Sequence, residues 1–145
     1  MIDFEFYPEN NLIISIFHGK MSSQELNEFI DRLLKIENIE GGMRGLVIFC
    51  KNIRLDGIKY SDIYSAGKKM HKAPFRKNGK NAIIANTKLG YTIAKMYQSV
   101  TEVVGLDETK VFKGYALKDA TEWLGIAHFY NQLNELIERC ESAIP

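Results

Sequence analysis

Apolar and polar residues alternate at the start of the chain. Ile2, Phe4 and Phe6 are each separated by one residue, which is the period of a strand with one solvent-facing side. Residues 8–11 read Pro-Glu-Asn-Asn and have turn chemistry, and residues 12–18 have the composition of a second strand. Because the two strands are so close in sequence, we expect them to pair as an antiparallel hairpin.

Two later segments are continuously apolar instead of alternating. Residues 46–50 read Leu-Val-Ile-Phe-Cys, and residues 82–85 read Ala-Ile-Ile-Ala. Runs of this kind are typical of central parallel strands that helices cover on both faces. Residues 110–112, Lys-Val-Phe, predict a further short strand.

Helical periodicity fills the segments between these strands. Ser22 and Glu25 have the spacing of a capping box, which predicts a helix that begins there and ends at Gly41 and Gly42. Residues 61–72 predict a second helix, which Pro74 stops. The apolar positions of these two helices are Leu26, Phe29, Ile30, Leu33, Leu34, Ile63, Ala66, Met70 and Ala73.

The second half of the chain predicts three more helices. Thr87 caps a long one, and residues 117–124 form a short one that ends at Gly125. Residues 126–140 are a final helical segment with apolar residues every three or four positions: Ile126, Phe129, Leu133, Leu136 and Cys140. Two heptads are too short to form a stable coiled coil alone. We therefore expect this helix either to dock on its own domain or to complete a homodimer.

This order of elements predicts an α/β fold. We expect a mixed sheet of about five strands, with an N-terminal antiparallel hairpin, then parallel strands joined by right-handed crossover helices, and an extra C-terminal helix. With 145 residues and 46% apolar composition, the chain can bury one substantial core. The expected organisation is one domain over residues 1–125, with residues 126–145 as its helical extension.

Charge and cysteine content indicate the compartment in which the protein is expected. The net charge of +1 gives no whole-molecule field that would draw the chain onto nucleic acid or an anionic membrane. Cys50 and Cys140 fit no paired metal spacing, and two isolated thiols favour a reducing compartment. The start of the chain lacks a secretory pattern, and no apolar run approaches the roughly 20 residues of a membrane span. We expect a cytoplasmic protein without stable membrane insertion.

Two packing motifs carry a resemblance to a known family. Residues 110–112, Lys-Val-Phe, precede residues 120–124, Ala-Thr-Glu-Trp-Leu, and residues 75–77, Phe-Arg-Lys, lead into residues 82–84, Ala-Ile-Ile. Together with the element order, they resemble the STAS-like proteins of the SpoIIAA-like group, whose fold is related to the CRAL-TRIO lipid-transfer domain. The resemblance covers roughly Ile2 to Gly125.

The resemblance implies a non-enzymatic domain for regulated protein contact or for binding a small ligand. In anti-sigma factor antagonists of this fold, a serine that opens the helix after the third strand is phosphorylated within an Asp-Ser-Ser-Gly motif. The corresponding residues 55–62 read Leu-Asp-Gly-Ile-Lys-Tyr-Ser-Asp, without the paired serines. Ser61 is therefore a phosphoacceptor candidate by position, and an ordinary helix N-cap by composition.

Catalytic and cofactor motifs are missing from the sequence. It has neither the glycine-rich loop of nucleotide enzymes nor the histidine spacing of metal sites, and His18, His71 and His128 lie on different predicted elements. Cys50 ends a core strand, where burial is the favoured interpretation. We expect no metal, no cofactor and no enzyme activity, although a site assembled from distant residues stays open.

Ligands of open α/β sheets bind beyond the carboxyl ends of the strands. On that ground, the ligand-binding candidates are Lys51, Asn86, Thr87 and Tyr91. The same residues also suit ordinary loops and caps. Trp123 is expected to pack on the core at the end of the sheet.

Charge is segregated in the middle of the chain. From Ile63 to Thr101 there are eight Lys or Arg residues and no Asp or Glu. The densest part is a candidate surface for an acidic protein or a small anion, and it consists of Lys68, Lys69, Lys72, Arg76, Lys77 and Lys80. An ordinary solvated face is the other interpretation. Nucleic acid is not expected as a partner, because the dense part contains only one aromatic residue, Phe75.

Two functions from different classes are therefore open. One is a non-catalytic regulatory or protein-interaction module of the STAS-like type. The other is a carrier of a small apolar ligand or lipid, as the CRAL-TRIO relationship implies.

Overall fold

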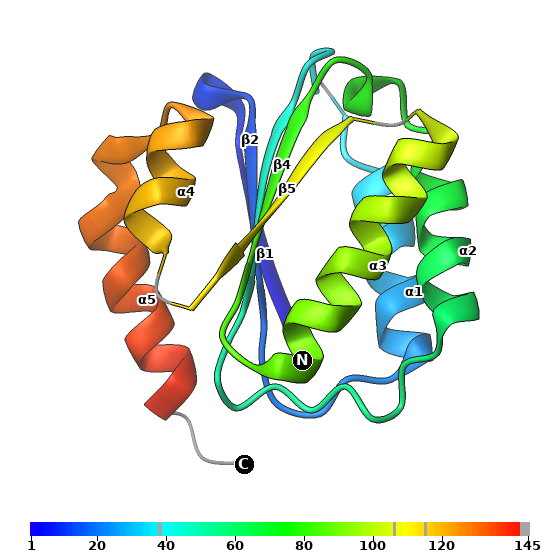
Figure 1. Cartoon of the computed structure of the whole chain (residues 1–145). Helices are drawn as coiled ribbons and strands as arrows, with labels where there is room; N and C mark the ends of the chain where they lie inside the picture. The colour runs from blue at the N-terminus through cyan, green and yellow to red at the C-terminus, as the bar shows by residue number, and fades with distance from the viewer. Residues whose placement is uncertain (38, 106, 115, 143–145) are drawn as a thin grey trace.

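The computed structural model describes residues 1–37, 39–105, 107–114 and 116–142, which form a five-stranded sheet with helices on both faces (Figure 1). The strands lie side by side in chain order, with β1 antiparallel to β2 and all later neighbours parallel. They are β1 (Ile2–Tyr7), β2 (Leu12–Phe17), β3 (Arg44–Phe49), β4 (Lys80–Ala85) and β5 (Glu108–Lys113). The fold class predicted from the apolar pattern is confirmed.

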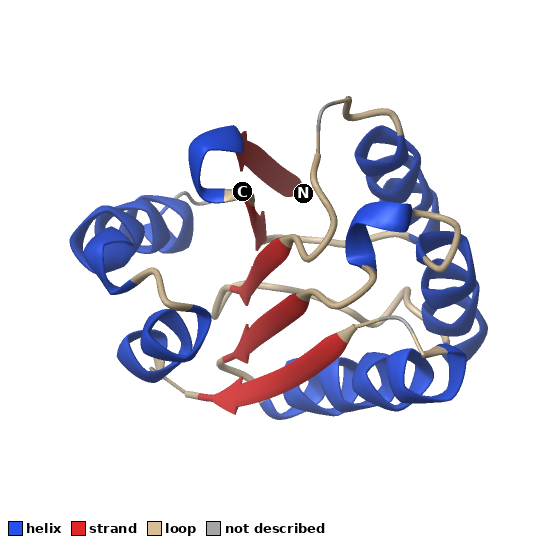
Figure 2. Cartoon of the chain, turned by 90° about the horizontal axis from the view of Figure 1, so that it is seen from above, coloured by secondary structure: helices blue, strands red, loops and turns tan. Residues whose placement is uncertain are grey.

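The crossover helices share one face because of the strand order. The chain always steps to the next strand in the same direction, so right-handed crossovers place every connecting helix on the same side. These helices are α1 (Ser23–Leu34), α2 (Tyr60–Met70) and α3 (Lys88–Val104). The opposite face is covered by α4 (Leu117–Leu124) and α5 (Tyr130–Ser142), as the view from above shows (Figure 2).

The sheet therefore separates two apolar cores. Phe17, Phe49 and Ile83 belong to the core under α1, α2 and α3. Their strand neighbours on the other face, including Ile16 and Ile84, belong to the core under α4 and α5. Burial on both faces explains why β3 and β4 are continuously apolar in sequence.

The predicted helix boundaries are partly confirmed. Ser22 Oγ accepts a hydrogen bond from Glu25 N at 3.1 Å, and Gly125 ends α4 with a φ of 74°. However, α1 ends at Leu34 and not at the glycines, because the backbone N–H groups of Lys35 and Ile36 bond carbonyls only three residues earlier and tighten the last turn.

The prediction that Ser61 caps α2 is wrong. Lys59 is the N-cap, and its N–H donates to Asp62 Oδ2 at 2.8 Å, so α2 begins at Tyr60. A carboxylate in the first turn is a stronger acceptor than a hydroxyl and is favoured by the helix dipole. Ser61 is an exposed residue of the first turn.

The C-terminal helix docks on its own sheet. Leu133 and Ile137 of α5 and Phe129 of the preceding turn Ala127–Phe129 are buried in the second core. The apolar seam predicted from the sequence is therefore already covered within the chain. In the described part of the chain, no helix combines the length and the apolar character that crossing a bilayer requires.

Candidate ligand-binding cavity

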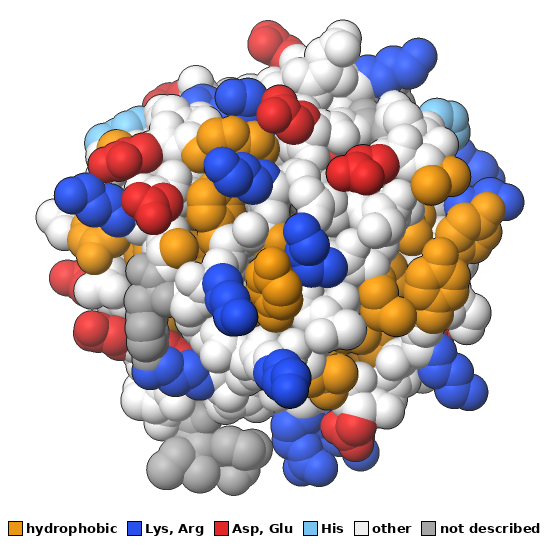
Figure 3. All heavy atoms as spheres, in the orientation of Figure 1, with side chains coloured by type: hydrophobic (Ala, Val, Ile, Leu, Met, Phe, Trp, Pro, Cys, Tyr) orange, Lys and Arg blue, Asp and Glu red, His pale blue; other side chains and the backbone are white. Residues whose placement is uncertain are grey.

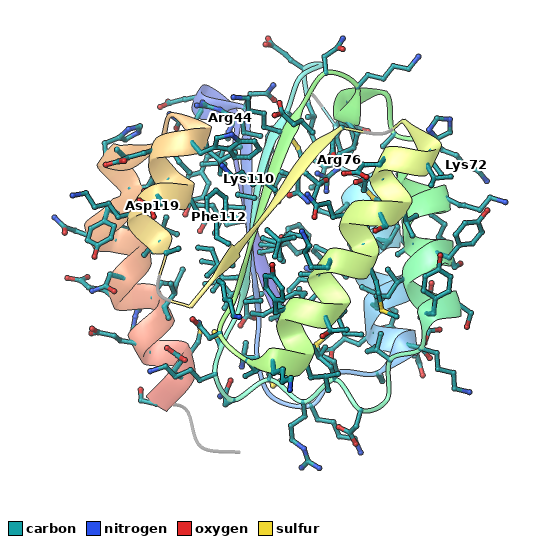
Figure 4. All side chains as sticks on the ribbon, viewed as in Figure 1. Arg44, Lys72, Arg76, Lys110, Phe112 and Asp119 are labelled. Carbon is teal, nitrogen blue, oxygen red and sulfur yellow. The ribbon has the colours of Figure 1, made fainter. Side chains whose placement is uncertain are left out.

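A cavity of about 70 Å³ lies between the sheet and the three crossover helices. Its walls come from β2, β3, β4 and all three helices, and they are mainly apolar. The apolar lining includes Phe17, Phe29, Phe49, Ile63, Ile83 and Ile93. Arg76 and Asn81 also line this space, near the points where β3 and β4 begin. Figure 4 shows Arg76 on the side of the sheet that α3 covers.

Gly45 creates the room for these polar side chains. It is paired with Asn81 in the sheet register, and both residues face the crossover helices. A Cβ on Gly45 would lie 2.6 Å from Asn81 Oδ1 and 3.2 Å from Arg76 Nη1. Any larger side chain at this position would therefore occupy the space that the amide and the guanidinium now use.

Arg76 is held by a buried ion pair. It belongs to the turn Pro74–Arg76, and its Nη1 lies 3.2 Å from Asp107 Oδ2, with side-chain exposures of 7% and 1%. The other carboxylate oxygen of Asp107 accepts a hydrogen bond from Thr109 Oγ1 at 2.6 Å. Both oxygens of this carboxylate are thus used, and the charge of Arg76 is balanced inside the protein.

Two residues that line the cavity each carry a buried polar atom without a partner. Arg76 Nε and Asn81 Oδ1 are buried and have no hydrogen-bond partner among the described residues. Leaving such a group unsatisfied costs about 1–3 kcal/mol, and more when the group is charged. One is a donor and the other an acceptor, so a bound group that can both accept and donate would satisfy the pair.

Tyr97 and Ser15 add hydroxyl groups to the lining. Burial raises the pKa of Tyr97, with a smaller opposing effect of Arg76 and a further increase from Asp107. The Tyr97 hydroxyl therefore stays protonated at neutral pH. Ser15 is the polar member of an otherwise apolar strand, with 2% of its surface exposed.

The four residues predicted to bind a ligand are engaged in separate local structures. Asn86 Nδ2 donates to Phe49 O at 3.4 Å, while its Oδ1 is buried with no partner among the described residues. Thr87 Oγ1 accepts from Gly90 N at 3.0 Å as the predicted cap of α3. Lys51 N donates to a carboxylate oxygen of Glu141 in α5 at 2.8 Å. The Tyr91 ring lies under two lysine ammonium groups, those of Lys95 and Lys113. A strand order without a reversal also leaves no switch point at this edge of the sheet.

The basic stretch does not form one continuous surface. The prediction that Arg76 belongs to an exposed basic surface is wrong, because this residue is 6% exposed and its guanidinium pairs with Asp107. Lys80 faces the α4 side, where its Nζ lies 4.9 Å from the centre of the Trp123 ring. Lys69 pairs with Asp31 at 3.2 Å, and Lys68, Lys72 and Lys77 are exposed. Positive side chains are spread among acidic and apolar ones on the face in Figure 3.

Trp123 and Cys50 lie on the α4 side of the sheet. Trp123 is half-buried against Phe112, with the ring centres 6.0 Å apart. Cys50 is fully buried, and burial is the main cause that raises its pKa to about 12, followed by Cys140 and Glu141. The thiol is therefore protonated at neutral pH, in keeping with a packing role.

No protein-family model, no curated protein and no solved structure matches this chain. What the chain binds must therefore be argued from its own cavity and charges. Sequence reasoning missed Arg76, Asn81 and Tyr97 as cavity residues. A signal existed for Asn81, since it takes an inward position of β4 that Ile83 and Ala85 share two and four residues later.

Proposed function

We propose that this chain is a non-catalytic binding module that encloses a small, mainly apolar molecule with a neutral polar head group. The observation that carries the proposal is the pair of unpartnered polar atoms, Arg76 Nε and Asn81 Oδ1, in a cavity with apolar walls. This combination is the usual design of small-molecule sites, in which apolar walls supply affinity and a few polar groups fix orientation.

The charge balance of the cavity favours a neutral head group. Asp107 already compensates Arg76, so a ligand carboxylate would leave one uncompensated negative charge in a buried site. A hydroxyl group can accept from Arg76 Nε and donate to Asn81 Oδ1 at the same time. An alcohol or a phenol is therefore the chemical class that fits best.

The size of the cavity favours a small ligand over a long-chain lipid. At about 70 Å³, it has on the order of half the volume of an engineered apolar cavity of ~150 Å³ that binds benzene. We expect the apolar part of the ligand to be a short branched or cyclic group. Arginine and an amide do not exchange protons near neutral pH, which favours binding without catalysis.

The test compares two probes of the same shape and different charge. Isobutanol and isobutyrate are titrated into the full chain, and the chemical-shift changes of the backbone amides are followed by NMR. We expect saturable shifts in β3 and β4 with isobutanol, and at least tenfold weaker binding of isobutyrate, which corresponds to about 1.4 kcal/mol. Equal or tighter binding of isobutyrate would contradict the neutral head group.

A pair of glycine variants localises the binding. Gly45→Ala places a methyl group against Asn81 Oδ1, whereas Gly41→Ala lies in the open, with no atom within 4 Å of the added Cβ. We expect Gly45→Ala to lose isobutanol binding and Gly41→Ala to keep it. Binding that survives in a folded Gly45→Ala chain would place the ligand elsewhere.

A regulatory interaction module of the STAS-like type is the second candidate function. It is favoured by an exposed aromatic pair on α2, because aromatic residues are enriched at protein interfaces. Tyr60 and Tyr64 are stacked with ring centres 6.5 Å apart, and they are 55% and 40% exposed. Ser61 lies in the same turn, and Lys68 Nζ lies 5.4 Å from the centre of the Tyr64 ring. Hydrophobic side chains gather over this side of the molecule, near α2 and α3 (Figure 3).

This second candidate is tested by affinity capture from the source organism. The wild-type chain is compared with a Tyr60→Ser, Tyr64→Ser variant and with Tyr130→Ser, a control on α5 at 38% exposure. The proposal expects a protein that is captured by the wild type and by the control, and lost with the double variant. Identical capture by all three chains would contradict it.

A further inference from the structure

Three side chains with different metal-ligating atoms meet where β1, the end of β2 and the end of α5 come together. His18 Nε2 lies 2.8 Å from Asp3 Oδ2. Cys140 completes the group, and one ligand atom from each of the three residues lies within 4.8 Å of the others. We infer that Asp3, His18 and Cys140 form a binding site for a single zinc ion.

The hairpin positions the first two ligands. Asp3 is paired with Ile16 in the antiparallel register, and both lie on the face of the sheet that α5 covers. His18 directly follows β2. It lies two residues after Ile16 and therefore faces the same side. The backbone N–H of His18 donates to Met1 O at 2.9 Å, so the pairing of β1 with β2 continues as far as this metal ligand. His18 is 9% exposed, so its imidazole is the fixed member of the group.

Two hydrogen bonds position the third ligand. Asn52 Nδ2 donates to the backbone carbonyl of Cys140 at 3.2 Å, and Lys51 N donates to Glu141 Oε2 at 2.8 Å. Both bonds join the last turns of α5 to the loop after β3. Cys140 is therefore held beside His18 by contacts that do not involve the ligand atoms themselves, an arrangement that orients metal ligands in proteins.

The donor set selects the metal. A thiolate and an imidazole prefer zinc over magnesium or calcium, and zinc also accepts a carboxylate oxygen. Bonds of about 2.0–2.3 Å in a tetrahedral site place donor atoms roughly 3.3–3.8 Å apart. The three ligand atoms lie within 4.8 Å of one another, so shifts of about 1 Å bring them to that spacing. The Asp3 side chain, which is 67% exposed, has room to adjust. Cys140 would bind as the thiolate and release its proton to solvent.

A shallow groove gives access to the site. It has a volume of about 180 Å³, lies between β1 and α5, and is lined by Asp3 and Cys140 together with Glu5, Tyr7 and Leu136. Three protein ligands leave a fourth position of a tetrahedral ion open toward this groove. The site lies on the opposite face of the sheet from the ligand cavity, so the inference does not depend on the proposed function.

The test uses cobalt(II) as a spectroscopic substitute for zinc. When a thiolate binds cobalt, a sulfur-to-cobalt charge-transfer band appears in the near ultraviolet. We expect the full chain to bind one Co²⁺ with this band, and zinc to displace it. Cys140→Ser should abolish the band, while His18→Gln and Asp3→Asn should weaken Co²⁺ binding by more than about tenfold. Asp3→Asn keeps the test interpretable, because an exposed side chain has little influence on folding.

Cys50→Ala and His128→Gln are the matched controls. Cys50 is the other thiol of the chain, and His128 is an exposed histidine on the same side of the sheet as α5. Both variants are expected to keep the band and the wild-type affinity. Absence of the band in the wild type, its survival in Cys140→Ser, or its loss in Cys50→Ala would each overturn the inference.

Discussion

Arg76 Nη1 and Asp107 Oδ2 lie 3.2 Å apart in a place that solvent scarcely reaches. The two residues come from different loops, one after α2 and the other before β5, and Arg76 also lines the cavity. Thr109 occupies the second oxygen of Asp107, and Arg76 Nε is buried with no hydrogen-bond partner in the part of the chain that the structure describes.

Loss of this ion pair should strongly destabilise the fold. Arg76→Ala leaves the Asp107 carboxylate buried and without its cation, at an expected cost of about 3–5 kcal/mol in the free energy of unfolding. Lys69 and Asp31 form a pair of the same length, 3.2 Å, with side-chain exposures of 36% and 53%. Lys69→Ala should therefore cost only about 0–1 kcal/mol. Urea denaturation measures both values, and similar losses in the two variants would contradict the role assigned to burial.

Gly45→Ala should destabilise the chain by steric overlap. The added Cβ would lie 2.6 Å from Asn81 Oδ1, so the amide or the strand has to shift. We expect a cost of about 1–3 kcal/mol, and a change within about 0.5 kcal/mol for Gly41→Ala, whose Cβ meets no atom. Thermal denaturation of the two variants compares them. A Gly45→Ala chain as stable as the wild type would show that the polar end of the cavity is not tightly filled.

The buried thiol of Cys50 should make stability depend on alkaline pH. Its pKa is raised, chiefly by burial, from 9.0 to about 12. The folded state therefore favours the protonated thiol, and this contribution is fully present below pH 9.0 and is lost as the pH rises toward about 12. Cys50→Ala should flatten the alkaline decline in the free energy of unfolding relative to the wild type. Parallel pH profiles of the two chains would show that the thiol does not contribute.

The C-terminal helix should be essential for the fold. Leu133 is 1% exposed in the core under α4 and α5, so Leu133→Asp buries a carboxylate and should cost about 3 kcal/mol or more. Asn134, the next residue, is exposed, and Asn134→Asp serves as the control with little effect. Circular dichroism melting curves test the pair. If the two variants have the same melting temperature, the packing of α5 contributes little to stability.

The sheet could be predicted because the local spacing of apolar residues along each strand shows which of its faces are buried. The alternation from Ile2 to Phe6 and the apolar runs of β3 and β4 each follow from which faces are covered. The end of α1 and the cap of α2 were missed because they depend on competition between neighbouring backbone and side-chain hydrogen bonds, such as the bond from Lys59 N to Asp62.

The candidate sites could not be predicted in the same way. Arg76 stands among basic residues that are typical of a solvated surface, and only the position of Asp107 against it in space accounts for its burial. Asp3 and His18 are 15 residues apart, and Cys140 comes from the distant helix α5, so no motif spacing connects the three residues. Sites of this kind arise from tertiary packing, which single-sequence patterns do not encode.

The location of a bound neutral probe decides whether the cavity is the binding site. Isotope-edited NMR detects nuclear Overhauser contacts between unlabelled isobutanol and labelled methyl groups of the chain. We expect contacts to the methyl groups of Ile83 and Ile93, which line the cavity, and none to those of Val103, which is 80% exposed on α3. Contacts only to exposed methyl groups such as those of Val103, or saturable binding without contacts to Ile83 and Ile93, would contradict the proposal that the cavity is the binding site.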